Sequence, residues 1–518
     1  MFFISYTFVL FFGILLLLYY LLPKNMQTVL LLCASLIFYG WTDFRYLFFV
    51  LFTGVTIFAA GNLLQRIDSC KTIAHEKHAA EKSKKLVFLT ALFLNLGILA
   101  VTKYTNFVVG NINAFSGSRL SFENMIVPMG ISFYTFQAVS YLIDVYRGTV
   151  PAEKSLIRFL LFTSFFPQLI QGPISRYKDL SATLYSPQPF AWHHVSRGLL
   201  RILWGFFKKL VIADRLRPFI DGVFSAGGGT DGTTVFVGMV FYVVMLYADF
   251  SGGIDITIGA AESLGIVVTE NFKQPFFSTS LKVWWRRWHI TMGSWFRDYV
   301  FYPVATSRFM QKLNRRNKKR FGRKAAGKIS VYIATFLTWI ATGLWHGAGW
   351  NYVCWGLANC LILILSEELE PAYEKLRNVL HLKNSRIFRV FQSLRTFLLI
   401  CVLNLFDCAG SVKGALSAFA TILTKINPAV FSDGSLLSFG LGSGDYFVVA
   451  AAVFLVLAVD FYGYRAAENE KMPDIRNRIA TCALPIRLIV CYGLFLLVLV
   501  FGVYGIGYDS TQFIYNRF

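Results

Sequence analysis

Two of the seven histidines lie in membrane-associated sequence that is rich in tryptophan and glycine. His346 lies in TWIATGLWHGAGW (338–350), with no charged residue within ten positions on either side, and His289 lies in WWRRWHI (284–290). A buried imidazole has a lowered pKa, so it stays neutral and able to accept a proton. Each histidine is therefore a candidate general base, with a packed core histidine as the alternative. The other histidines lie in polar or basic segments, at positions 75, 78, 193, 194 and 381.

A hydroxyl group is a poor nucleophile at its own pKa and needs a base, which is the role we assign to His346. Gly343 and Gly347 flank it and would let another backbone or a ligand approach closely. We interpret His289 as a second base or as an orienting residue. On a continuous helix it would share a face with Trp285 and Arg286, and a nearby cation would lower its pKa. The residues expected to support the two histidines are Trp285, Arg287, Trp288, Trp345 and Asn351.

The segment FYVVMLYADFSGGIDITIG (241–259) places polar residues inside an apolar run. Asp249 and Asp255 flank Ser251-Gly252-Gly253, which predicts a broken helix. Carboxylates at membrane depth are costly and usually face a bundle interior or a wet cavity. Two readings stay open: the aspartates and Ser251 contact substrate, or the aspartates cap two half-helices.

The segment 270–304 alternates tryptophan with basic residues. Tryptophan and arginine together are typical of a membrane interface, so an amphipathic helix lying in the membrane plane is the alternative to a site. Ser278 or Thr279 is the expected cap of a helix that starts near residue 280.

The composition indicates a membrane protein. Of 518 residues, 56% are hydrophobic and 15% are charged, well below the roughly 25% charged residues of soluble domains. Apolar runs predict an all-α, polytopic integral membrane protein with about 11–13 membrane helices, plus re-entrant or interfacial helices, around a tunnel. The expected spans lie near 2–22, 26–42, 46–64, 86–102, 127–145, 234–250, 330–346, 350–366, 390–406, 445–462 and 485–507.

The net charge of +22 comes from basic segments between the apolar runs, at 66–85, 307–328, 375–395 and 465–478. This is the positive-inside pattern of cytoplasmic loops, so acidic membrane lipids are the expected partner and nucleic acid is not. The pattern predicts that both termini lie outside the cytoplasm. Residues 1–22 are predicted to be a retained first span, since no basic n-region or A-x-A site is present. The eight cysteines show no paired spacing, so neither disulfides nor a metal site is expected.

Several ordered motifs resemble those of the membrane-bound O-acyltransferases, closest to their bacterial alginate O-acetylation branch. They are PMGISFYTFQAVSYLIDVYRG (128–148), FPQLIQGPISRYKDL (166–180), YADFSGGIDITIG (247–259), ENFKQPFFSTSLKVWWRRWHITMGSWFRDY (270–299) and GLWHG (343–347). The resemblance covers most of residues 1–366 and the last few residues, and implies one membrane domain over 1–518. Its catalytic core would be residues 125–366 and its tail residues 508–518.

The resemblance implies that His346 is catalytic and that His289 is associated with activity. It implies transfer of an acyl group, with acetyl the first candidate, from a cytoplasmic thioester across the bacterial cytoplasmic membrane to an exported or cell-wall polysaccharide. No bound cofactor is implied; the donor would be acetyl-CoA or an acyl-carrier protein. An extracytoplasmic acyltransferase-like or esterase-like protein would be a partner.

The carboxyl-terminal sequence FIYNRF (513–518) resembles the family's aromatic tail, in which a tyrosine relays the acyl group. Tyr515 would be that relay, because a phenol ester is a more activated donor than a sugar ester. Asn516 departs from the pattern, where an aromatic residue is usual. The alternative is that Phe513 and Phe518 pack the tail against the domain.

Other function classes remain open at this point. D-alanyl transfer to teichoic acid from a carrier-protein thioester fits the same motifs, and a polysaccharide or lipid-precursor transporter fits polar residues within spans. A transporter would more typically show two repeated halves with discontinuous helices, and no repeat is visible. A non-catalytic scaffold leaves the two histidines without a role.

Overall fold

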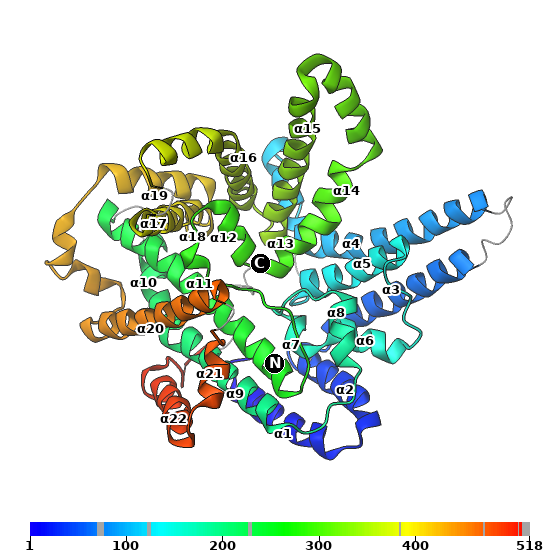
Figure 1. The fold of residues 1–518 in the computed structure, drawn as a ribbon, viewed down its shortest axis with the longest axis horizontal. Coiled ribbons are helices and arrows are strands. Elements are labelled where there is room, and N and C mark those ends of the chain that lie inside the picture. The colour runs from blue at the N-terminus through cyan, green and yellow to red at the C-terminus, as the bar shows by residue number, and fades with distance from the viewer. Residues whose placement is uncertain are drawn as a thin grey trace. The chain divides into compact units, whose positions relative to one another are not determined.

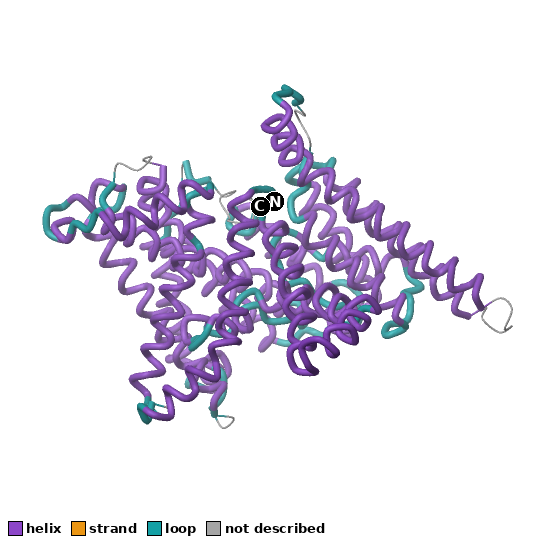
Figure 2. Tube along the Cα trace, turned by 90° about the horizontal axis from the view of Figure 1, so that it is seen from above, coloured by secondary structure: helices purple, strands orange, loops and turns teal. Residues whose placement is uncertain are grey.

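The computed structural model describes residues 1–69, 77–121, 126–225, 230–382, 385–469, 472–505 and 507–509. This part of the chain is mostly helical and contains no β-strand, only an isolated bridge between Phe272 and Trp288 (Figure 2). The expectation of an all-α membrane protein is confirmed. The described chain divides into two compact units, and the expectation of one membrane domain stays a prediction.

Eight helices in the described ranges are long and apolar enough to cross a membrane. Each of the eleven predicted spans falls on a helix, but α1, α2 and α5 have 16, 14 and 17 residues, fewer than the roughly 20 of a perpendicular span. The eight are α3 (Tyr46–Ser69), α4 (Lys77–Ser116), α11 (Gly232–Ser263), α15 (Arg308–His346), α16 (Trp350–Val379), α17 (Arg386–Leu403), α20 (Ser443–Glu468) and α22 (Leu484–Phe501).

The first unit comprises residues 1–202, 253–269 and 509 of the described chain. Helices α3 and α4 run side by side within it (Figure 1). Its other helices are α1 (Tyr6–Leu21), η1 (Lys24–Met26), α2 (Gln27–Gly40), α5 (Ile131–Arg147), α6 (Leu156–Ser164), α7 (Phe166–Leu169), α8 (Tyr177–Leu184), most of α9 (Trp192–Phe206) and the end of α11.

Helix α5 is the centre of the first unit. Every residue from Ile131 to Leu142 is buried, as expected of a helix that is apolar on all faces. Two of its polar side chains bond to other segments: the Gln137 amide donates to the Phe162 carbonyl at 2.7 Å, and the Tyr141 hydroxyl accepts from the Glu153 amide at 2.8 Å. These bonds join α5 to the segments that follow it.

The second unit comprises residues 203–252 and 270–508 of the described chain and contains both candidate histidines. Besides the spans named above, its elements are η2 (Phe207–Ala213, a π-helix), α10 (Asp214–Ser225), η3 (Pro275–Phe277), α12 (Leu281–Arg287), α13 (Ile290–Phe296), η4 (Arg297–Phe301, a π-helix), α14 (Tyr302–Ala305), α18 (Leu405–Cys408), α19 (Val412–Thr424), η5 (Pro428–Phe431), η6 (Ser435–Phe439) and α21 (Ile475–Thr481).

The basic segment 307–328 is not a loop, as the sequence had suggested, but the first part of α15, with a kink at Gly322 (φ +82°). Lysine, arginine and alanine are good helix formers, which favours a helix in this charged segment. The non-helical backbone of Gly322 separates it from the spanning helix Gly327–His346, and Asn314 donates to Ser330 at 3.2 Å across the bend. Ser307 caps its start and accepts from the Met310 amide.

Glycines permit a close helix contact inside the first unit. A Cβ on Gly198 of α9 would lie 2.2 Å from Ser263 Oγ and 2.4 Å from the Gly259 carbonyl oxygen on α11. Real Cβ atoms do not approach neighbours this closely, so the two backbones touch only because residue 198 has no side chain.

We expect Gly198→Ala to lower the free energy of unfolding by about 1–3 kcal/mol, because the added methyl group forces the two helices apart. The melting temperature in detergent measures the effect. Gly97→Ala is the control, since no atom lies within 4 Å of its Cβ position. Equal melting temperatures for both variants would contradict the proposed close contact.

Candidate active site

His289 lies between two short helices and not on one continuous helix, so the predicted shared face with Trp285 and Arg286 is wrong. Helix α12 ends at Arg287, α13 begins at Ile290, and His289 has a left-handed backbone with φ +48°. This conformation is uncommon for any residue other than glycine and persists only where the surroundings enforce it. Here the Lys273 amide donates to the Arg287 carbonyl (2.9 Å) and the Ile290 amide to the Asn271 carbonyl (3.0 Å).

Asn271 sets the orientation of the His289 ring. Its side-chain oxygen lies 3.3 Å from His289 Nδ1 and also accepts from the Thr291 amide (3.0 Å) and hydroxyl (2.9 Å). Because that oxygen is an acceptor, Nδ1 must carry the ring proton when His289 is neutral. Nε2 then holds the lone pair and is the basic atom. Asn271 had not been predicted, although it lies in the quoted motif ENFKQPF.

His289 is 1% exposed. Burial holds its pKa well below the usual value, and His346 lowers the pKa further. The expected cause, a nearby cation, is wrong. The neighbouring Arg287 guanidinium donates instead to the Phe277 carbonyl at 3.2 Å and lies 5.1 Å from the centre of the Tyr464 ring.

His346 is the last residue of α15 and is half-buried, less enclosed than the sequence predicted, because it ends the helix. Its Nδ1 lies 2.8 Å from the Thr342 carbonyl oxygen. A carbonyl only accepts, so Nδ1 is again the protonated atom and Nε2 the basic one. The ring packs on Trp355, with centroids 4.6 Å apart.

The glycines around His346 have the predicted role. A Cβ on Gly343 would lie 2.5 Å from the Tyr352 carbonyl oxygen, and one on Gly347 would lie 2.1 Å from the Tyr352 ring. A Cβ on Gly356 would lie 2.4 Å from the Trp339 carbonyl oxygen. Helices α15 and α16 therefore meet backbone to backbone beside the histidine.

Trp345 brings the two histidines together. Its ring centroid lies 5.6 Å from that of His289 and 5.2 Å from that of His346. The indole is 5% exposed, so this side of the pair is screened from water. Two imidazoles with basic Nε2 atoms thus share one aromatic partner. Each would act as a general base for a hydroxyl that comes within hydrogen-bonding distance of its Nε2.

Most tryptophans of the stretch 270–304 are core residues. Trp284, Trp288 and Trp295 are buried, so anchoring at a lipid interface is wrong for these three. Trp284 stacks on Trp288 at 5.3 Å. Trp285 Nε1 donates to Asn359 at 3.1 Å. The cap of α12 is Ser280, not Ser278 or Thr279, because only Ser280 accepts from the Val283 amide.

The predicted break at Ser251-Gly252-Gly253 is wrong, and α11 continues through it. The aspartates therefore do not cap half-helices; each pairs with a cation. Asp249 lies 2.7 Å from Lys209 Nζ, and in the first unit Asp255 lies 2.9 Å from Arg201 Nε. A Cβ on Gly252 would lie 2.9 Å from the Gly205 carbonyl oxygen, so this glycine serves close packing.

Lys209 joins two carboxylates in the interior of the second unit. It is fully buried and lies 2.7 Å from both Asp214 and Asp249, while Lys208 donates to Ser251 at 2.8 Å. The pair of lysines in the apolar run FFKKLVIAD (206–214) was the available signal for this cluster. Its arrangement indicates a structural role for Asp249 and Ser251.

Asn351 belongs to a second polar cluster, whose other members had not been predicted from the sequence. Asn351 Nδ2 donates to the Phe406 carbonyl at 3.1 Å, and the Tyr352 hydroxyl donates to Asp407 at 3.1 Å. Tyr242 also donates to Asp407, at 2.5 Å. These bonds hold the start of α16 beside α18. Tyr515 lies outside the described residues.

The comparisons with known proteins agree with the motifs. The model of the membrane-bound O-acyltransferase family matches residues 150–315 and 319–408. The Probable alginate O-acetylase AlgI of Pseudomonas fluorescens is 33% identical over 468 residues, covering 88% of this chain and 82% of that protein. The Probable alginate O-acetylase AlgI of Pseudomonas syringae pv. tomato is 37% identical over 343 residues, or 65% of this chain.

The matched region is shorter in other relatives. It spans 61% of the length of the Pseudomonas syringae protein. The Peptidoglycan O-acetyltransferase of Helicobacter pylori is 29% identical over 373 residues, covering 67% of this chain and 65% of that protein.

We expect Lys209→Met to destabilise the protein by about 3–5 kcal/mol, because it leaves two carboxylates buried without their shared cation. Melting in detergent measures the loss. Lys282→Met is the control, since its pair with Glu367 is more than half exposed and contributes little. A Lys209→Met protein as stable as the control would contradict the structural role of the cluster.

The lowered pKa of His289 predicts a pH-dependent stability. The unfolded chain binds a proton at this residue more readily than the folded protein does, so its contribution is full above the ordinary pKa of 6.5 and declines as the pH falls below it. Melting temperatures between pH 7.5 and pH 5 should therefore fall less steeply for His289→Gln than for the natural protein. His78→Gln, at an exposed histidine, should keep the natural slope; parallel slopes for all three proteins would refute the assignment.

Proposed function

This chain belongs to the membrane-bound O-acyltransferase family, and we propose that it is an O-acyltransferase acting on an exported or cell-wall polysaccharide. The acyl group, with acetyl the first candidate, would come from a cytoplasmic thioester, either acetyl-CoA or an acyl-carrier protein. The observation that supports this most is the pair His289 and His346 on either side of Trp345, each with Nε2 as the basic atom.

The pair supports acyl transfer in the following steps. His346 Nε2 takes the proton of an acceptor hydroxyl as its oxygen attacks the thioester carbonyl. The tetrahedral intermediate collapses, the carbon–sulfur bond breaks, and the thiolate leaves and takes up the proton that His346 holds. Positioned base catalysis of this kind contributes about 10²–10⁴ in rate. The nearby tryptophans would limit the water that competes for the thioester.

Further parts of the proposal concern the carboxyl-terminal tail, the partner protein, the location of the chain and the acceptor polymer. Tyr515 would receive the acyl group as a phenol ester and pass it to an extracytoplasmic acyltransferase-like or esterase-like partner. The protein would lie in the bacterial cytoplasmic membrane with both termini outside, which a carboxyl-terminal reporter active only in the cytoplasm would disprove. The relatives named above act, by their names, on alginate and peptidoglycan, and these are the first acceptors to examine.

We expect His346→Ala to lower acyl transfer by about 10²-fold or more, because the acceptor hydroxyl loses its base. Purified protein in liposomes, given a radiolabelled acetyl thioester and acceptor polymer, reports the transferred label; a transporter would leave the thioester intact. Mass spectrometry of surface polymers, with and without the gene, identifies the ester.

The control is His193→Ala, an exposed histidine of the first unit, which should retain full activity. Tyr515→Phe belongs in the same series: unchanged polymer acylation would remove the tyrosine from the mechanism. A His346→Ala protein with normal abundance and full transfer would falsify the assignment of the base.

A further inference from the structure

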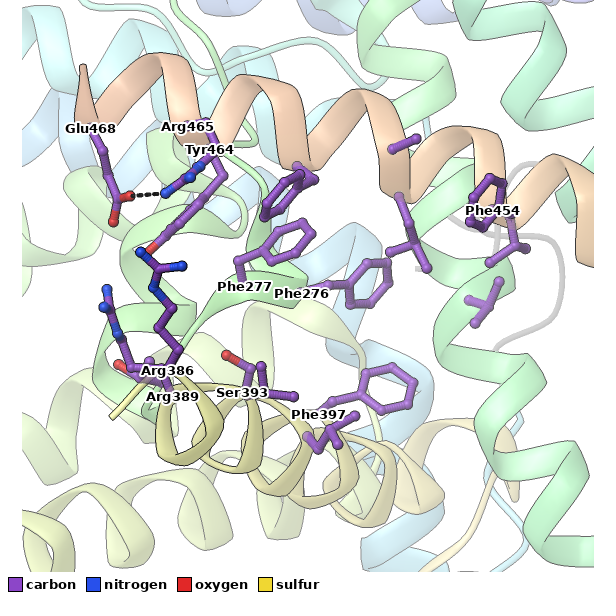
Figure 3. Close-up of a pocket in the computed structure, with 18 residues that line it drawn as sticks. Phe276, Phe277, Arg386, Arg389, Ser393, Phe397, Phe454, Tyr464, Arg465 and Glu468 are labelled. Atoms are coloured by element: carbon purple, nitrogen blue, oxygen red, sulfur yellow. Dashed lines mark ion pairs between the residues drawn. The ribbon is translucent and has the colours of Figure 1, made fainter. Parts of the chain in front are cut away.

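A cavity of about 840 Å³ lies in the second unit between α17 and α20, within the usual range of ligand pockets. Its remaining wall comes from η3 and from Val244 of α11. Figure 3 shows it as a groove between the two helices, with phenylalanine rings along its length. No predicted site residue lines it.

One end of the groove is positively charged. Arg386 and Arg389 of α17 and Arg465 of α20 gather there, with Glu468 as the one acidic lining residue, which gives a net charge of +2 (three minus one) (Figure 3). Arg465 Nη1 lies 4.0 Å from Glu468 Oε2. Guanidinium groups bind phosphate oxygens through paired hydrogen bonds, so this end suits an anionic phosphate.

The rest of the groove is apolar and opens on the outer surface of the unit. Phe276, Phe277 and Phe397 line it, and Phe454 and Val390 are 74% and 60% exposed. Helices α17 and α20 are both long and apolar enough to cross a membrane, so their exposed apolar side chains face lipid tails. An occupant therefore enters from the bilayer.

The groove is separate from the histidine pair. Phe276 packs on Trp284 with ring centroids 5.9 Å apart, and Trp284 stacks on Trp288 at 5.3 Å, next to His289 in sequence. Neither histidine nor Trp345 lines the groove. The groove is thus distinct from the candidate active site.

We propose that this groove binds an anionic phospholipid. Its phosphate lies on the arginine side chains at positions 386, 389 and 465, and an acyl chain lies along the phenylalanines. A lipid without net charge would leave the net charge of +2 at this end uncompensated, and a water-soluble thioester would have to expose its charged body to lipid tails at the apolar mouth. The inference is independent of the reaction proposed above.

The test is native mass spectrometry of the purified full chain in an uncharged detergent, titrated with dioleoylphosphatidylglycerol or dioleoylphosphatidylcholine. We expect the first phosphatidylglycerol to bind about tenfold or more tightly than phosphatidylcholine, since each basic residue near the headgroup contributes favourably. The variant R386Q/R389Q/R465Q should lose this preference. Ser393→Trp, which fills the groove and keeps the arginines, should weaken phosphatidylglycerol binding to the same extent.

The matched control is K282Q/K413Q/K425Q, which removes three exposed positive charges from the same unit, outside the groove and outside the basic segments, and should retain the preference. Glycerol 3-phosphate, which has the headgroup charge but no tail, should not compete. The proposal is overturned if either groove variant keeps the preference, if the control loses it equally, or if glycerol 3-phosphate competes. Acetyl-CoA binding that only the groove variants lose would assign the groove to a thioester and would also overturn it.

Discussion

The second unit depends on a buried cation shared between two helices. Lys209 on η2 lies 2.7 Å from Asp249 on α11, and neither side chain has any exposed surface. A charge at this depth is costly unless it is paired, so the pair fixes η2 against α11 at one register. Phe250, the next residue along α11, packs on the His289 ring with centroids 4.8 Å apart. The ion pair of Lys209 and Asp249 thus fixes the ring against which His289 packs, although neither residue contacts His289.

Hydrogen bonds to buried polar groups likewise orient both imidazole rings. Asn271 accepts three hydrogen bonds from the segment that contains His289, and the Thr342 carbonyl accepts from His346 one helical turn later. In each ring Nδ1 donates the hydrogen bond, so Nε2 is the nitrogen that is able to accept a proton. Close contact of α15 with α16 at Gly343 and Gly356 then sets where the second ring lies. Packing and hydrogen bonding therefore together fix the orientation of both candidate bases.

Sequence reasoning predicted the helical membrane class, the location of every expected span on a helix, and the two histidines that the structure brings together. Composition and apolar length determine the first two, and isolated polar residues in apolar runs indicate the third. It failed where a partner lies far along the chain. A break at Ser251-Gly252-Gly253 was predicted because the ion pair of Asp249 with Lys209 cannot be recognised from the local sequence. A helical backbone was assumed at His289 because its left-handed conformation depends on hydrogen bonds to Asn271, which belongs to a different segment.

The unequal burial of the two histidines argues for unequal roles. His289 is enclosed by Phe250 and Trp345, whereas His346 is half-buried at a helix end. Since a positive charge on one imidazole disfavours a charge on the other, the pair holds one proton more readily than two. A proton is less costly on the ring with more access to water, which supports the proposal that His346, and not His289, acts as the base. The enclosed His289 packs on Trp345, which in turn contacts His346, so we propose that His289 holds these rings in position.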